Sequence, residues 1–127
     1  MAVLSRRSRS YAKERTVNMN VTELAKIANL TPITLPDPEK EVKGAYIGDL
    51  LSWVMGRADE GNAWITIMLN SNVLAVATLA DVGCVILAEG VMPDEGVATT
   101  AEAKGINLLS SKESAYETAK RLSAAGL

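Results

Sequence analysis

The residues best suited to bind a ligand form a polar cluster near the middle of the chain. Thr66 lies in a strand-like segment, and Asn70, Ser71 and Asn72 follow it where a helix-like segment begins. Uncharged hydroxyl and amide groups beside a helix N-terminus can hold a phosphate or the edge of a base without catalysing a reaction. Helix capping alone would equally explain Asn70 and Ser71, so the sequence leaves both interpretations open for this cluster.

Asp49 is the carboxylate with the most informative position, because it lies between a strand-like and a helix-like segment. The favoured interpretation is a helix N-cap, which stabilises a helix by about 1 kcal/mol. The alternative is a binding role, in which Asp49 accepts a hydrogen bond from a ligand hydroxyl or amine, or supplies half of a metal site. We therefore include Asp49 among the candidate ligand-binding residues.

The composition argues against most kinds of enzyme. The chain has no His, which removes the commonest general base and the commonest metal ligand. Its single Cys, Cys84, lies in the apolar run 82–88, where a buried core residue is favoured over a reactive thiol. Neither a Gly-x-x-x-x-Gly-Lys-Ser/Thr phosphate-binding loop nor a Gly-x-Ser-x-Gly motif occurs. We predict a protein that is not an enzyme and has no catalytic residues, no cofactor and no metal site; an enzyme with Asp49 as general base is the least favoured alternative.

Strand-like and helix-like segments alternate from residue 42 to the C-terminus. Short apolar runs predict strands over 42–47, 62–68, 82–88 and 106–109. Helices are predicted over 50–55, 72–79, 94–104 and 110–122, the last of them opened by the capping box Ser110-x-x-Glu113. Such alternation predicts an α/β fold: three α/β/α layers around a mostly parallel sheet of four or five strands.

The segment before residue 42 predicts one further helix and one further strand. Asn20-x-x-Glu23 is a capping box that opens a helix ending near Asn29. Residues 33–35 form a short predicted strand, which we expect at the edge of the sheet. If the strands that precede Asp49 and Asn70 are parallel neighbours, the junctions 48–49 and 68–72 lie side by side at the carboxyl edge of the sheet. An anionic ligand bound there would contact the candidate residues named above.

Charge divides the chain into two parts. Residues 1–18 carry a net charge of +4 within a total of −2, so residues 19–127 carry −6. We expect residues 1–18 to be a disordered, dispensable basic extension and residues 19–127 to form the single domain. An acidic domain argues against binding to nucleic acid, and no apolar stretch approaches the roughly 20 residues that span a bilayer. The protein is expected to be cytoplasmic, with no nucleic-acid or membrane partner.

Several motifs resemble those of the DRTGG domain family, over about residues 19–125. The matching segments are Val42-x-Gly44, Tyr46-x-x-Asp49-Leu50-Leu51-Ser52, Trp64-Ile65-Thr66-Ile67 and Asn72-Val73-x-Ala75-Val76-Ala77. The five-letter motif that names the family is not literal here, since its region reads Lys-Glu-Val-Lys-Gly over residues 40–44. The resemblance implies a fold similar to the N-terminal domain of HPr kinase/phosphorylase.

The resemblance also implies a role, because such domains are regulatory or dimer-forming and not catalytic. On these grounds we predict a regulatory or small-ligand-sensing module that self-associates as a homodimer, with adenine nucleotides as the first ligands to test. The alternative is a structural dimerisation or scaffold protein without a small ligand, with a protein partner, accessory to an iron-only hydrogenase system.

Overall fold

The computed structural model describes residues 18–127. The basic extension expected over residues 1–18 lies almost wholly outside the described residues, so its boundary with the domain stays a prediction. Within the described part of the chain, no helix is long and apolar enough to cross a membrane.

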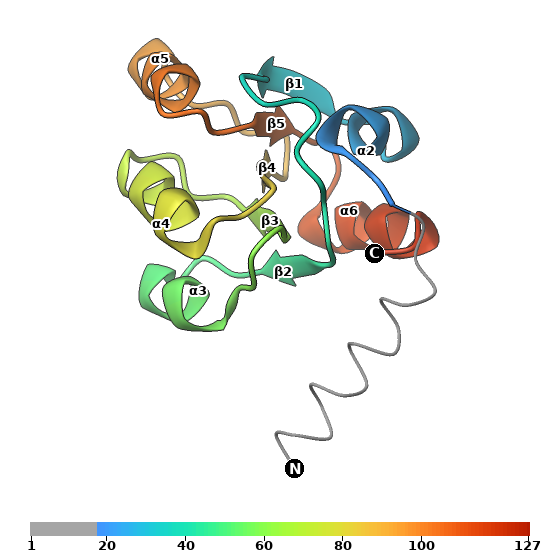
Figure 1. Cartoon of the computed structure of the whole chain (residues 1–127). Coiled ribbons are helices and arrows are strands. Elements are labelled where there is room, and N and C mark those ends of the chain that lie inside the picture. The colour runs from blue at the N-terminus through green and yellow to red at the C-terminus, as the bar shows by residue number, and fades with distance from the viewer. Residues whose placement is uncertain (1–17) are drawn as a thin grey trace.

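Five strands form one mixed sheet in the order β1-β5-β4-β3-β2, with five helices around it (Figure 1). The strands are β1 (Thr31–Thr34), β2 (Ala45–Ile47), β3 (Ala63–Thr66), β4 (Cys84–Leu87) and β5 (Leu108–Ser110). The helices are α2 (Val21–Ile27), α3 (Leu51–Arg57), α4 (Asn72–Ala80), α5 (Glu95–Ala103) and α6 (Ala115–Ala124). Strands β2 to β5 are parallel, and only β1 runs antiparallel, against β5. The predicted α/β class, the mostly parallel sheet and the edge position of the first strand are confirmed.

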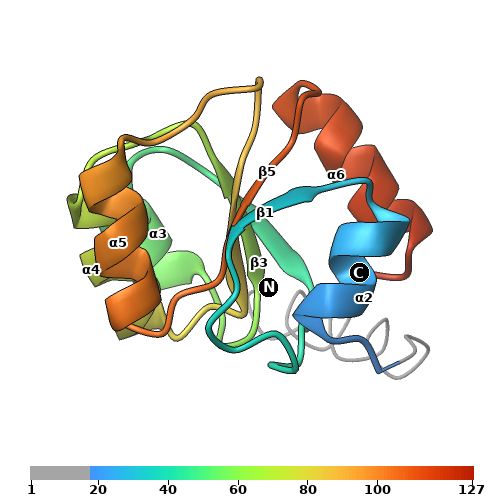
Figure 2. The ribbon, with the colours of Figure 1, turned by 90° about the horizontal axis from the view of Figure 1, so that it is seen from above.

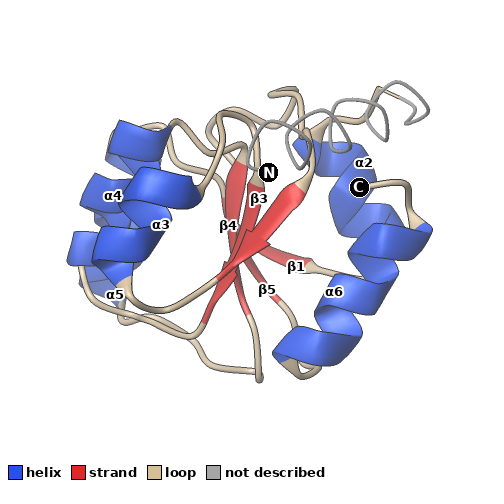
Figure 3. Ribbon diagram, turned by 90° about the horizontal axis from the view of Figure 1, so that it is seen from below, coloured by secondary structure: helices blue, strands red, loops and turns tan. Residues whose placement is uncertain are grey.

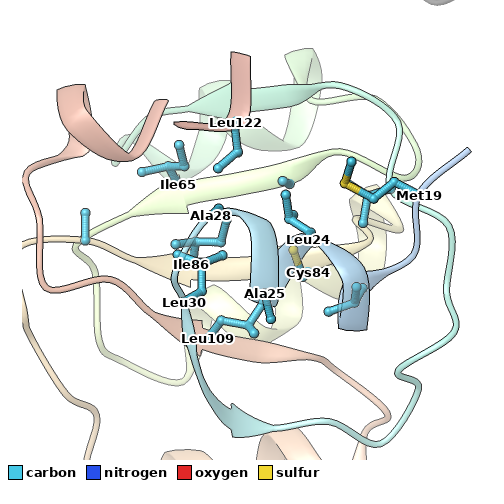
Figure 4. Close-up of a cluster of buried hydrophobic side chains, with 14 residues drawn as sticks. Met19, Leu24, Ala25, Ala28, Leu30, Ile65, Cys84, Ile86, Leu109 and Leu122 are labelled. Atoms are coloured by element: carbon cyan, nitrogen blue, oxygen red, sulfur yellow. The ribbon is translucent and has the colours of Figure 1, made fainter. Parts of the chain in front are cut away.

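The helices divide unequally between the two faces of the sheet. Helices α3, α4 and α5 cover one face, and α2 and α6 cover the other (Figures 2 and 3). Each face has its own apolar core, since side chains alternate along a strand. The core under α2 and α6 includes Ile65, Cys84, Ile86 and Leu122 (Figure 4). Strands β3 and β4 are buried throughout, as expected for parallel strands covered on both faces.

The helix caps show where sequence patterns succeed and where they fail. The capping box of α2 is present, with Asn20 and Glu23 exchanging side-chain-to-backbone hydrogen bonds. The predicted capping box at Ser110 is wrong, because that residue is buried at the end of β5. Helix α6 instead begins after Ser114, whose side chain accepts from the Glu117 amide. The same Ser-x-x-Glu spacing occurs at both places, and strand pairing with β4 takes the first one into the sheet.

Candidate functional site

The two predicted junctions do lie at one edge of the sheet. Strands β2 and β3 are parallel neighbours, with Tyr46 opposite Trp64 and Ile47 opposite Ile65. Their carboxyl ends therefore lead to Asp49 and Thr66 at the same edge. The Thr66 hydroxyl donates to Asp49 Oδ1 at 2.7 Å, and this contact joins the two junctions directly.

Asp49 is not the N-cap of α3, so the favoured interpretation of this residue is wrong. The N-cap position is Leu50, and α3 has no side-chain cap. Asp49 Oδ1 instead accepts a second hydrogen bond from the Ile67 amide at 3.0 Å. The carboxylate thus ties the end of β2 to the end of β3. Asp49 is exposed, and within residues 18–127 no hydrogen bond uses its second oxygen.

Thr66 positions Asp49 and does not face solvent. The residue is 2% exposed, and its hydroxyl accepts from the Met68 amide at 3.2 Å while donating to Asp49. A buried hydroxyl without partners would be destabilising, so these two bonds satisfy it. Thr66 would therefore act on a ligand through the orientation of Asp49.

The remaining predicted residues lie at the start of α4. Asn70 Oδ1 accepts from the Asn72 amide at 2.9 Å, so the capping explanation holds for Asn70. It does not hold for Ser71, which occupies the N-cap position in a helical conformation without a side-chain hydrogen bond. Asn70, Ser71 and Asn72 are all exposed. Their amides and hydroxyl can therefore reach solvent, but within residues 18–127 no hydrogen bond joins them to the Asp49–Thr66 contact.

A small hollow lies beside Asn70 at this edge of the sheet. This hollow of about 10 Å³ lies between α4 and α5, which is room for about one water molecule. It is lined mainly by apolar side chains: Met68, Leu69, Asn70, Val73, Leu74, Leu87, Pro93, Val97 and Leu108. A hollow of about 100 Å³ lies at the amino edge of β4 and β5, with Lys104 and the ion pair Lys40–Asp81 (2.8 Å) in its lining. The hollow beside Asn70 is therefore too small to enclose a nucleotide.

The topological switch point of the sheet lies elsewhere, between β4 and β5. The chain leaves β4 toward α5 on one face and leaves β5 toward α6 on the other (Figure 2), which is where open α/β sheets commonly bind ligands. Here, however, backbone hydrogen bonds close the crevice, from the Glu89 amide to the Glu113 carbonyl and from the Ser111 amide to the Leu87 carbonyl. Sequence patterns could not locate this point, because the face that a helix covers is decided by the packing of the whole sheet.

Two charged groups of the β5–α6 connection pair with each other. The guanidinium of Arg121 donates through Nε and Nη2 to the two carboxylate oxygens of Glu113. These hydrogen bonds lower the pKa of Glu113 below its usual value. The pair is exposed to solvent, so water screens it and it contributes little to the stability of the fold.

The two tryptophans have different environments. Trp64 is fully buried, and its Nε1 donates to the Gly48 carbonyl at 2.9 Å, which fixes the backbone just before Asp49. Trp53 lies on α3 with 55% of its surface exposed. The Arg57 guanidinium lies 4.2 Å from the centre of the Trp53 ring, a cation–π distance.

The described residues contain few groups suited to catalysis. Residues 18–127 hold no group of three or more His, Cys, Asp or Glu side chains placed to bind a metal. Burial raises the pKa of the Cys84 thiol to about 12, so the thiolate, which is the reactive form, is disfavoured near neutral pH. Cys84 is a core residue, as predicted.

Comparison with known proteins places these features in a family. The sequence profile of the DRTGG domain matches residues 39–125. No curated protein sequence matches the chain significantly. A similar fold occurs in the crystal structure of the CBS and DRTGG domains of the regulatory region of Clostridium perfringens pyrophosphatase, complexed with its activator diadenosine tetraphosphate.

The two folds superpose with a TM-score of 0.62 at 17% sequence identity. The alignment covers 94% of this chain and 56% of the pyrophosphatase chain, so this chain spans little more than half of that regulatory region. At this identity the likeness establishes the fold alone.

Proposed function

Because the chain belongs to the DRTGG domain family, we propose that it is a non-catalytic regulatory module that senses a small anionic ligand and associates with a second copy of itself. Adenine nucleotides are the first ligands to test. The support is the regulatory region of similar fold, whose activator is diadenosine tetraphosphate.

The observation that carries the proposed site is the Asp49–Thr66 contact, which brings both strand ends to one place. The second oxygen of Asp49 can accept a hydrogen bond from a ribose hydroxyl or an exocyclic amine. Asn70, Ser71 and Asn72 add uncharged donors beside it, and uncharged donors can hold a phosphate. The Asn70–Asn72 hydrogen bond holds the Asn70 side chain against the start of α4.

The small size of the hollow beside Asn70 limits the affinity that we expect for this site. Ligand pockets usually enclose several hundred Å³ and bury most of the ligand surface, whereas the hollow beside Asn70 measures about 10 Å³. We therefore expect a weak nucleotide site that relies on hydrogen bonds, with dissociation constants in the micromolar range or above.

The test is a pair of substitutions at Asn70, assayed by thermal shift with AMP, ADP, ATP and diadenosine tetraphosphate. A ligand at ~100 times its dissociation constant adds about 2.7 kcal/mol to the free energy of unfolding. Asn70→Asp keeps an oxygen for the Asn72 amide but repels an anion, so it should abolish the shift while stability holds. Asn70→Ala should lose about 1 kcal/mol of capping.

The matched control is Asn29→Asp, which makes the same change in charge at an exposed residue outside the predicted site. Asn29 has a φ of 56°, a conformation that Asp also tolerates, so this variant should bind like the parent. If Asn70→Asp binds nucleotide as well as the parent does, the anion site is not at this edge.

A scaffold without a small ligand is the second candidate function. The observation that favours it is that five of the nine exposed large hydrophobic side chains lie between residues 47 and 67, since exposed apolar surface can mark a protein interface. A chain that self-associates but shows no thermal shift with any of the four nucleotides would support the scaffold over the sensor.

A further inference from the structure

The chain has seven asparagines, and six of them are followed by a buried residue. The exposed fractions of these following residues are all small: Met19 6%, Val21 0%, Leu30 7%, Ala63 0%, Val73 2% and Leu108 1%. Asn70 is the exception, because Ser71 after it is exposed. Ser71 is therefore the one residue following an asparagine that water reaches freely.

This difference matters for one reaction of the asparagine side chain. The backbone nitrogen of the following residue can attack the side-chain carbonyl carbon, Cγ, and the five-membered ring that forms expels ammonia. Asparagine is a thermolabile residue for this reason. A buried neighbour resists the reaction, because the ring cannot close unless tightly packed backbone moves.

Neither of the two nitrogens that change partners in this reaction is held by a hydrogen bond at Asn70. Within residues 18–127, the Ser71 amide donates to no acceptor, and the side-chain nitrogen Nδ2 of Asn70 has no hydrogen-bond partner. In the buried Asn62 and Asn107, by contrast, Nδ2 donates to a backbone carbonyl at 2.7 Å. The attacking nitrogen and the leaving group at Asn70 can therefore both exchange protons with water.

The oxygen of the Asn70 side chain is placed to assist the attack. Oδ1 accepts from the Asn72 amide at 2.9 Å, which turns the side chain toward the Ser71 peptide that lies between the two residues. Negative charge develops on this oxygen when Cγ is attacked, and a backbone amide directed at such an oxygen stabilises the transition state. The amide belongs to the first residue of α4, where the positive end of the helix dipole adds to this effect.

We propose that Asn70 is a site of spontaneous deamidation, a modification that converts it to aspartate or isoaspartate. The Ser71 nitrogen loses its proton to water and bonds to Cγ, the bond from Cγ to Nδ2 breaks, and Nδ2 leaves as ammonia after taking a proton from water. A water molecule then adds to one of the two carbonyl carbons of the ring and opens it. In balance, asparagine and water give ammonia and either aspartate or isoaspartate, and no electron is transferred.

The effect of this modification on binding, unlike its chemistry, rests on the proposed function. Deamidation creates at residue 70 the same negative charge as the Asn70→Asp substitution, so it should remove anion binding from this edge of the sheet. The aspartate product still offers an oxygen to the Asn72 amide, and a negative charge near a helix N-terminus is stabilising. The site would therefore lose its ligand as the protein ages, without loss of the fold.

Incubation of the full chain at mildly alkaline pH, followed by peptide mass spectrometry, tests the chemistry. Exchange of the amide for a carboxyl group raises the mass by about 1 Da, and fragmentation of the peptide assigns this increase to one residue. Asn70 should be converted before any of the other six asparagines. An earlier conversion elsewhere, for instance at the exposed Asn29, would overturn the inference.

Two variants test the mechanism, and circular dichroism checks that each of them is folded. Ser71→Val places a stiff, branched side chain beside the attacking nitrogen and removes no hydrogen bond, because the Ser71 side chain makes none. It should slow the conversion of Asn70 several-fold, and a rate equal to that of the parent would contradict the mechanism. Asn70→Gln keeps the amide but would have to form a larger ring, so it should give no product over the same time.

The deamidated product separates this inference from the proposed function. Anion exchange isolates the deamidated chain through its additional negative charge, and a thermal shift with ATP then compares it with the unreacted chain. A deamidated chain that binds ATP as well as the unreacted chain does would leave the modification site standing and refute an anion site at Asn70. A chain that stays unmodified at Asn70 would refute the modification, and the Asn70→Asp assay would still judge the nucleotide site.

Discussion

The Asp49–Thr66 contact should contribute to stability as a coupled pair, and a double-mutant cycle measures that coupling. Thr66 is 2% exposed, and its hydroxyl donates to a carboxylate at 2.7 Å. Hydrogen bonds to charged groups contribute about 1.5–3 kcal/mol, and the exposure of Asp49 to water favours the lower end. Thr66→Val also removes the acceptor of the Met68 amide. We expect Thr66→Val to lower the free energy of unfolding by about 2 kcal/mol.

The second arm of the cycle is Asp49→Ala, which leaves the buried Thr66 hydroxyl without its acceptor and should cost about 1–3 kcal/mol. In the double variant the same contact cannot be lost twice. The two effects should therefore fall short of additive by about 1 kcal/mol. Urea unfolding followed by circular dichroism measures the free energy of unfolding of all four proteins. If this free energy depends on urea concentration with the same slope in each, their unfolded states are comparable.

The control cycle combines Thr66→Val with Asp94→Ala. Asp94 caps α5 by accepting from the Val97 amide at 2.9 Å and makes no contact with Thr66 in the described structure. Those effects should add within about 0.3–0.5 kcal/mol. If the Asp49–Thr66 cycle is additive to the same degree, Asp49 stabilises the protein independently of Thr66, as a helix cap would, and the tertiary account of this residue is refuted.

Two further predictions concern a pair of glycines and the buried thiol. Gly83→Ala should lower the free energy of unfolding by about 1–3 kcal/mol, because its new Cβ would lie 2.8 Å from the Gly61 carbonyl oxygen. In α3, a Cβ at Gly56 would have nothing within 4 Å, so Gly56→Ala should raise the free energy of unfolding by about 1 kcal/mol. Urea unfolding of both variants checks this, and a Gly83→Ala variant as stable as the parent would contradict it. Burial raises the pKa of Cys84 from 9.0 to about 12, so between these values the unfolded thiol ionises while the folded one does not. Above pH 9 the free energy of unfolding of the parent should therefore fall relative to that of Cys84→Ala, by up to about 1.4 kcal/mol per pH unit. Parallel curves of stability against pH for the two proteins would show that folding does not change the pKa of the thiol.

Local patterns were sufficient for much of the fold. The apolar run around Cys84 predicted a strand with a buried core residue, and β4 is buried at every position. Asn20-x-x-Glu23 predicted a capping box that α2 contains. These features depend on residues a few positions apart, so the chain near them determines the outcome. The strand expected over 42–47 begins only at Ala45, because Gly44 adopts a φ of 72° that breaks the extended backbone.

The position of the two strand-to-helix junctions was predicted, but their contacts were not. The alternation of segments placed the junctions of Asp49 and Asn70 at one edge, and the parallel pairing of β2 with β3 confirms it. Sequence spacing favoured Asp49 as a cap for the helix that follows it. Its carboxylate instead bonds to Thr66 and Ile67, seventeen and eighteen residues away, and no local pattern reports such a contact.

The sequence by itself determined the class of the fold, the alternation of its elements, the absence of His and the candidate polar residues, because composition and periodicity are properties of the chain. Only the tertiary structure decided which face each helix covers, which strand ends the sheet and which of two identical Ser-x-x-Glu patterns opens α6. Ser110 meets the sequence rule for a cap as well as Ser114 does, but pairing of β5 with β4 buries it in the sheet. Interactions between segments distant in sequence settle these choices, since they outweigh the small energies of local preference.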